Sequence, residues 1–350
     1  MTTSTTFRRG VQLAISILVG ALCLWFAFRG LKDGAEGQEV HADVIFGVIE
    51  RIPLSAYVAY LLIFVVQTVV RVERWRLQVR GLTGRAPGWR DALTINAFAF
   101  AAVFLLPFRL GEFVRPNLCA RRGIMTASAG LASTALERVI DGLVTTALFG
   151  VLLLIAPFDL PTWVRAGGLS ALLFFGAAVV FFVAAVVARS RVLPLVERVI
   201  AAVSPALAVK IIGIVDAFLD GLRCFRGVKD LGVYVLLSVA YWLLNGMGTE
   251  VIVLAIDPHA SWLAGLFCLC FLVIAVMLPA PPGNVGTFHA FAKLGLTVTG
   301  VAAVPAVASA VVLHALGIIS LLLLAGVFVV VGSVGWRDAS HSLDDTTAPG

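Results

Sequence analysis

The chain has 350 residues, of which 60% are hydrophobic and 13% are charged, and its mean hydropathy is +1.02. This composition excludes a soluble globular protein and predicts a polytopic membrane protein. The net charge of +6 is explained by cations gathered on the cytoplasmic side of a membrane, so we expect no nucleic-acid partner.

The first predicted element is a membrane span at about 11–28, after a short polar start and Arg8-Arg9. A basic start followed by an apolar stretch is also typical of a signal peptide. Here the apolar stretch is longer than a typical signal sequence, and Phe28-Arg29-Gly30 offers no Ala-x-Ala-like cleavage site. We therefore interpret it as a retained span.

Five further apolar stretches are long enough to cross the bilayer, which takes about 20 helical residues. They lie at about 53–72, 127–156, 163–188, 230–256 and 303–331. The segment 191–229 combines helical spacing with many cations, which is typical of helices on the inner membrane surface. We expect one transmembrane domain over 1–335, followed by a polar, disordered cytoplasmic tail at 336–350.

Two other apolar segments, at about 91–122 and 262–299, are broken in the middle. The first break reads Leu106-Pro107-Phe108-Arg109-Leu110-Gly111, and the second reads Leu278-Pro279-Ala280-Pro281-Pro282-Gly283. Proline cannot continue a helix and glycine relaxes the backbone. Broken helices survive in a membrane only where they are buried in protein or line a wet cavity. Because each arm is too short to cross comfortably, we predict two re-entrant helical hairpins.

The distribution of cations sets the predicted topology. With the N-terminus in the cytoplasm, 20 of the 26 Lys and Arg residues fall on the cytoplasmic side and 5 outside, while Arg138 lies within a span. This asymmetry obeys the positive-inside rule, and the C-terminus is then cytoplasmic too. Half one, about 53–156, and half two, about 230–331, become the same unit in opposite orientations. The predicted fold class is an all-α polytopic membrane protein with about six full spans and two re-entrant hairpins arranged as an inverted repeat, a common transporter architecture.

Three ionisable residues, Glu137, Arg138 and Asp141, lie near mid-membrane depth in the predicted span 127–156. Each costs about 2.5–3.5 kcal/mol there on insertion scales. Helical spacing places Glu137 and Asp141 on one face and lets Arg138 pair with Asp141. The cluster indicates a polar cavity or an ion path, and the alternative is a self-neutralising packing cluster.

The first break is followed by Arg109, Glu112 and Arg115. We expect these residues to recognise an anionic headgroup, because the forked guanidinium donors of arginine match phosphate. The alternative is snorkelling of the cations toward the cytoplasmic interface.

The second break has no strong local cation. Gly283 and Asn284 start the short helix that follows, so backbone N–H groups would substitute for side-chain donors. His289 lies on that helix, and His314 lies in the predicted span 303–331 at a depth similar to that of Glu137. For both histidines a structural role and a role in the site are equally open.

Other chemistry is not indicated. The five cysteines form neither a disulfide framework nor a zinc pattern, and the sequence contains no Walker A motif and no nucleophile elbow. We predict no metal site, no cofactor and no enzymatic activity.

Four motifs, in order, resemble the flippase-like family, which is the transmembrane region of lysylphosphatidylglycerol synthases and its stand-alone relatives. They are Arg74-Trp75-Arg76-Leu77, Gly111-Glu112-x-x-Arg115, Glu137-Arg138-Val139-x-Asp141 and Pro281-Pro282-Gly283-x-x-Gly286, within a resemblance over about 10–335. The resemblance implies that the substrate is a membrane lipid, an aminoacylated phosphatidylglycerol or a polyprenyl-linked glycolipid. It implies translocation of that lipid across a bacterial or archaeal cytoplasmic membrane. It does not extend to the synthases' soluble aminoacyl-transferase domain, and His289 stands where the family usually has an acid.

The leading hypothesis is therefore a lipid translocator. The headgroup phosphate would be bound by Arg109, Arg115 and Arg138. Those cations would be balanced, or an amino-bearing headgroup held, by Glu112, Glu137 and Asp141.

Two alternatives from other classes stay open. One is a non-catalytic membrane scaffold or partner subunit of a separately encoded lipid or envelope synthase. The other is an intramembrane lipid-modifying enzyme with Glu137 and His314 as acid and base. Partners left open are a second copy of the chain and a lipid-synthesising enzyme.

Overall fold

A computed structural model of the protein describes residues 18, 20–25, 27, 32–33, 38–39, 42–105, 111–187, 189–202, 204–205, 207–209, 212–213, 224–225, 227–277 and 281–330. The regular structure in these residues is helical, apart from one antiparallel pair of two-residue strands, β1 (Lys32–Asp33) and β2 (Gln38–Glu39). The predicted tail at 336–350 and most of the predicted first span at 11–28 lie outside the described residues.

Four helices in the described part are long and apolar enough to cross a membrane. They are α3 (Leu54–Thr83), α6 (Ala127–Ile155), α10 (Val228–Ile256) and α13 (Ala303–Val330). They confirm a polytopic helical membrane protein. The full count of six spans stays a prediction, although α7 (Thr162–Val187) forms a single helix where one span was expected.

The boundary of α3 corrects the sequence-based one. The prediction ended this span at residue 72 because Arg74, Arg76 and Arg80 follow, and it placed those cations in a cytoplasmic loop. The helix instead continues to Thr83 and ends at Gly84, which has the left-handed φ of +81° that favours glycine at a helix end. Arg74 is therefore carried into the bundle.

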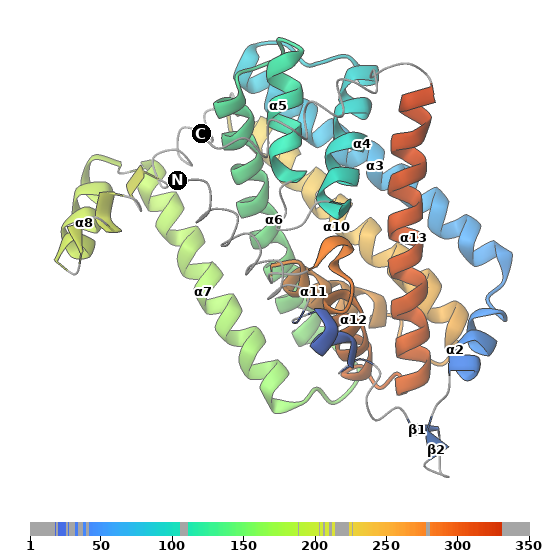
Figure 1. The fold of residues 1–350 in the computed structure, drawn as a ribbon. Coiled ribbons are helices and arrows are strands. Elements are labelled where there is room, and N and C mark those ends of the chain that lie inside the picture. The colour runs from blue at the N-terminus through green and yellow to red at the C-terminus, as the bar shows by residue number, and fades with distance from the viewer. Residues whose placement is uncertain are drawn as a thin grey trace, which may run out of the picture.

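Each broken segment forms two short helices. The first consists of α4 (Trp89–Leu105) and α5 (Val114–Arg121), and the second of α11 (Ala264–Met277) and α12 (Thr287–Thr297). Residues 106–110, which include Arg109, and residues 278–280 lie outside the described residues. The two helices of each segment contact one another, and each is shorter than the about 20 residues a span needs. Figure 1 shows the first pair toward one end of the bundle and the second pair toward the other. Their entry from opposite membrane faces stays a prediction.

The second break has a specific backbone conformation. The 3-10 turn η2 (Pro282–Asn284) is followed by Gly286, and Gly283, Asn284 and Gly286 have φ values of +73°, +54° and +90°. Glycine and asparagine are the residues that adopt this left-handed region readily. A side chain on Gly286 would also collide with the backbone of Gly20. The turn η2 contacts α4, so the second break reaches the first hairpin.

Two peripheral helices complete the described chain. Helix α2 (Ala42–Ile49) packs against α13, and α8 (Arg189–Ala201) follows α7. Leu195 and Val199 of α8 are exposed on a helix that also carries Arg191 and Arg198. This composition suits the predicted inner-surface helix, whose membrane placement stays a prediction.

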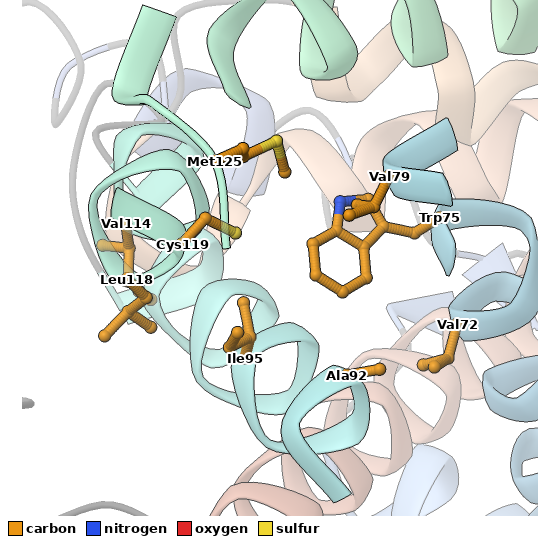
Figure 2. Packing of buried hydrophobic residues seen from close by; sticks show 10 residues of the cluster. Val72, Trp75, Val79, Ala92, Ile95, Val114, Leu118, Cys119 and Met125 are labelled. Atoms are coloured by element: carbon orange, nitrogen blue, oxygen red, sulfur yellow. The ribbon is translucent and has the colours of Figure 1, made fainter. Parts of the chain in front are cut away.

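An apolar cluster packs the first hairpin against α3. Trp75 of α3 is 1% exposed and lies at its centre, with residues of α4 and α5 around it (Figure 2). The cluster contains Val72, Trp75, Val79, Ala92, Ile95, Ala102, Val114, Leu118, Cys119 and Met125. Because Trp75 fixes the rotation of α3 against the hairpin, it also fixes the direction of its neighbour Arg74.

The close approach within the first hairpin can be tested at Gly111. A Cβ there would collide with the backbone of Ala102 and Val103 on α4. We expect Gly111→Ala to lower the free energy of unfolding by about 1–3 kcal/mol, the usual cost of overpacking. Gly167→Ala on α7, where a Cβ meets no atom within 4 Å, should be neutral or stabilising by up to about 1 kcal/mol. Thermal unfolding in detergent measures both, and equal midpoints for the two variants would contradict the close packing.

Candidate functional site

Helix α6 directs two carboxylates into the bundle. Glu137 is 1% exposed and Asp141 is 5% exposed, on one face of the helix, as the four-residue spacing predicts. Asp141 lies at the midpoint of α6 (Ala127–Ile155). Two ionised groups this far from either end of an apolar helix require partners, because an unpaired charge there is costly.

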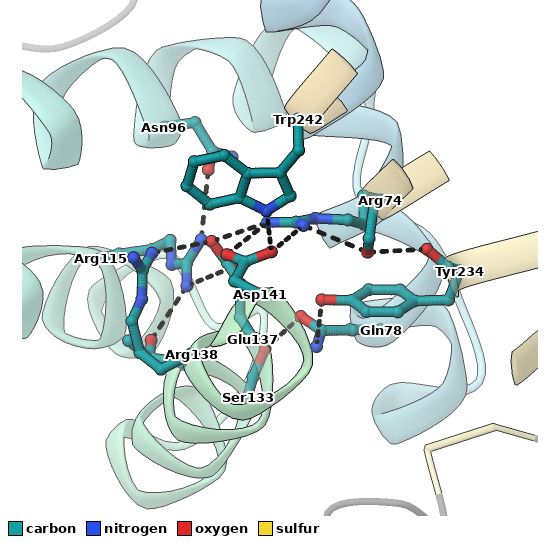
Figure 3. Close-up of polar contacts among 12 residues, drawn as sticks. Arg74, Gln78, Asn96, Arg115, Ser133, Glu137, Arg138, Asp141, Tyr234 and Trp242 are labelled. Atoms are coloured by element: carbon teal, nitrogen blue, oxygen red, sulfur yellow. Dashed lines mark hydrogen bonds and ion pairs between the residues drawn. The ribbon is translucent and has the colours of Figure 1, made fainter. Parts of the chain in front are cut away.

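Arg74 of α3 is the central partner of both carboxylates. Its Nη1 donates to Asp141 Oδ1, and its Nη2 donates to Asp141 Oδ2 at 3.1 Å (Figure 3). Nη2 also lies 3.2 Å from Glu137 Oε1. Nη1 also donates to Ser238 Oγ of α10 at 3.2 Å. Arg74 is 1% exposed. One guanidinium thus joins α3, α6 and α10 through charge-assisted hydrogen bonds, including a bidentate pair.

Glu137 contacts two further cations. Arg115 Nη2 of α5 lies 2.8 Å from its Oε2, and Arg138 Nη2 lies 3.0 Å from its Oε1. Arg115 also donates to Thr134 Oγ1 at 3.0 Å and to Asn96 Oδ1 of α4 at 3.5 Å. The expected pair between Arg138 and Asp141 is not the one formed, because Arg74 occupies both oxygens of Asp141. Arg138 binds its neighbour in sequence instead.

Neutral polar groups extend the cluster. Trp242 Nε1 of α10 donates to Asp141 Oδ1 at 3.1 Å. Gln78 of α3 donates to Tyr234 Oη at 3.0 Å and accepts from Ser133 Oγ at 2.8 Å. Asp141 and Glu137 thus accept from donors on α3, α5, α6 and α10.

Several members of this cluster were not predicted from the sequence, although the sequence contains a signal for them. Polar residues recur on one face of each helix at helical spacing. The sets are Arg71, Arg74 and Gln78 on α3; Ser133, Glu137 and Asp141 on α6; and Tyr234, Ser238 and Trp242 on α10. Counting Arg71 and Arg74 as cytoplasmic hid the first of these sets.

Arg71 lies beside the ion network without joining it. Its guanidinium carbon is 3.1 Å from the centre of the Phe100 ring and 5.3 Å from that of Tyr241. It lies within electrostatic range of Glu137, Arg138 and Arg74, and Glu112 lies within range of Arg138. Within the described residues, the cluster therefore has four guanidinium groups and three carboxylates. Arg109 is outside that set and is not counted.

The predicted residues of half two form a separate group around the second break. His314 Nε2 of α13 donates to the Gly283 carbonyl at 2.6 Å, and His289 Nδ1 of α12 accepts from the Gly286 N–H at 3.4 Å. The two rings meet edge to face with centres 4.7 Å apart, and Phe288 stacks on His314 at 4.8 Å. The Asn284 carbonyl accepts from Thr287 Oγ1 at 3.1 Å. These contacts hold the backbone of the second break against α12 and α13.

Comparison with known protein families gives a match over most of the chain. The family model described as the lysylphosphatidylglycerol synthase TM region matches residues 13–326. The curated proteins and the solved structures contain no match to the chain. The match confirms the resemblance of the four motifs.

The role of Arg74 can be tested through stability. Arg74→Gln leaves Asp141 and Glu137 buried with one cation fewer, which typically costs about 3–5 kcal/mol. Arg80→Gln is the matched control on the same helix, because Arg80 is 44% exposed and lies 3.7 Å from Asp230. We expect the control to change the unfolding free energy by less than about 1 kcal/mol. Size-exclusion chromatography and thermal unfolding in detergent compare them, and indistinguishable behaviour would contradict the central role of Arg74.

The role of His314 can be tested in the same way. His314→Phe keeps an aromatic ring against Phe288 and removes the donor to the Gly283 carbonyl. An unsatisfied buried carbonyl costs about 1–3 kcal/mol. His314→Gln, which retains a donor, should recover part of that loss. A His314→Phe protein as stable as the wild type would show that the contact does not hold the second break.

Proposed function

The chain belongs to the family of the lysylphosphatidylglycerol synthase transmembrane region, and from that premise we propose that it is a lipid translocator. It moves the headgroup of an anionic or aminoacylated phospholipid, or of a polyprenyl-linked glycolipid, across a bacterial or archaeal cytoplasmic membrane. The observation that carries the proposal is the buried, cation-rich cluster around Glu137 and Asp141, halfway along a helix long enough to cross the bilayer.

The cluster supplies what a crossing headgroup lacks. A phosphate entering the hydrocarbon core loses its hydration, and fixed charge-assisted donors replace that hydration only if they are already in place. Arginine suits this role because its planar fork matches phosphate oxygens. The acyl chains stay in the bilayer while the headgroup passes through the polar centre.

The contacts favour one of the two roles considered for the acids. Glu137 contacts Arg74, Arg115 and Arg138, and Asp141 contacts Arg74 and Trp242. Both carboxylates are already occupied by donors on this chain. They therefore balance the cations, and we assign them no contact with an amino group of the substrate.

The proposal includes the predicted topology. Six spans and two re-entrant hairpins form an inverted repeat with both termini in the cytoplasm. Two observations support it: each broken segment consists of two short helices that contact one another, and η2 contacts α4. The second break thus lies against α4 of the first hairpin, which lets one headgroup meet both hairpins during its passage.

The enzymatic alternative is disfavoured by the same contacts. Glu137 contacts three guanidinium groups, and His314 Nε2 donates to a backbone carbonyl. Glu137 and the Nε2 atom of His314 are thus engaged in contacts within the chain. We therefore propose that the chain makes no covalent change to its substrate.

Translocation can be measured in proteoliposomes. The wild-type protein should accelerate the movement of labelled phosphatidylglycerol between leaflets relative to protein-free vesicles. Arg138→Gln should slow it about tenfold or more, the effect of losing one charge-assisted contact, because Arg138 is half-buried and its loss leaves the Arg74 contacts in place. Arg80→Gln should move lipid at the wild-type rate.

A wild-type protein that moves none of a panel of native lipids would overturn the proposal. Labelling of cysteines introduced at Glu112 and Asp141 then distinguishes the alternatives. Cysteines that do not react indicate a dry centre and favour the scaffold or partner subunit. Cysteines that react indicate that water reaches the centre through a polar path.

A further inference from the structure

The four arginines of the cluster are not equivalent. Arg74 and Arg115 are 1% and 4% exposed, and both are held by carboxylates and by neutral acceptors on other helices. Removing either would break contacts between helices. These two cations form the framework of the cluster, because their Nη atoms contact carboxylates and neutral acceptors on several helices.

Arg71 and Arg138 are held differently. Both are only partly buried, and the Nε of each is a buried donor without a hydrogen-bond partner among the described residues. Arg71 is positioned by the face of Phe100 rather than by an acid. Stacking fixes the plane of a guanidinium and leaves its N–H groups, which lie in that plane, available. Arg138 has a single ion pair, to Glu137 Oε1.

The two residues share one neighbourhood. Arg71 and Arg138 lie within electrostatic range of each other, and Glu137 is a common neighbour. Two like charges with unpartnered donors are unfavourable in an apolar bundle unless an anion lies between them.

We infer that Arg71 and Arg138 are the pair that binds the headgroup anion, and that this anion is the phosphate of a membrane lipid. The inference rests on the proposed function and deepens it. It replaces Arg115 by Arg71 in the set expected to contact phosphate, and it assigns Arg115 to the framework.

Equilibrium binding to the full-length protein in an uncharged detergent tests the pair. Native mass spectrometry titrates three probes: phosphatidylglycerol, diacylglycerol and water-soluble glycerophosphoglycerol. The proteins are the wild type, Arg71→Gln, Arg138→Gln and the control Arg80→Gln, and their thermal unfolding is measured in parallel.

We expect Arg71→Gln and Arg138→Gln each to weaken phosphatidylglycerol binding about tenfold, the effect of one charge-assisted hydrogen bond. Arg80→Gln should bind as the wild type does, and no variant should change binding of diacylglycerol, which has no phosphate. Unfolding midpoints of both variants should stay close to that of the wild type, which separates them from framework variants such as Arg74→Gln.

Several results would overturn the inference. Wild-type affinity for phosphatidylglycerol in Arg71→Gln or in Arg138→Gln removes that arginine from the site. Equal binding of glycerophosphoglycerol and phosphatidylglycerol would show that the site needs only a soluble phosphate compound, and it would refute a lipid as the ligand. If vesicles show no lipid movement while binding depends on both arginines, the proposed translocation is wrong and the assignment of Arg71 and Arg138 to the phosphate site is supported. If lipid moves and both variants bind lipid as the wild type does, the assignment of Arg71 and Arg138 is wrong and the proposed translocation is supported.

Discussion

The contacts of Arg74 with Asp141 and Glu137 are the interaction on which the arrangement of the helices depends. The three residues connect α3 with α6, and Ser238 and Trp242 extend the connection to α10. In a bundle with few polar groups, each of these charges has only one low-energy partner arrangement. Trp75, next in sequence to Arg74, anchors the other face of α3 in the apolar cluster with α4 and α5. Adjacent residues thus fix α3 against both the hairpin and the acids.

The sequence was sufficient for the helical membrane fold and insufficient for the site. Long apolar stretches identify α6, α10 and α13 closely, because hydropathy alone determines such helices. The Leu-Pro and glycine positions identify both breaks. The predicted end of α3 was wrong because the sequence pattern of a cation near a membrane boundary does not show whether its side chain extends to water or pairs with an acid inside the bundle. The partner decides between them, and Asp141 of α6 is 67 residues away from Arg74 in the chain.

The two halves carry their polar groups differently. Half one surrounds its acids with arginines from α3, α5 and α6, whereas the second break is closed by His314 on the Gly283 carbonyl and by His289 on the Gly286 N–H. His289 here accepts a backbone hydrogen bond. Half two contributes to the charged centre through α10, whose Ser238 and Trp242 contact Arg74 and Asp141. The ionised groups of the cluster thus come from half one, and half two adds neutral polar contacts to them.

Stability alone does not account for such a cluster. Replacing a buried ion network with apolar side chains of similar volume is often neutral or stabilising by about 1–4 kcal/mol. Among the described residues, Arg71 lies over the Phe100 ring and has an unpartnered Nε, and Arg138 pairs with Glu137 and also has an unpartnered Nε. Buried donors without partners are unfavourable in the resting protein and gain partners when an anion is bound, which is the energetic relation a headgroup-binding centre requires.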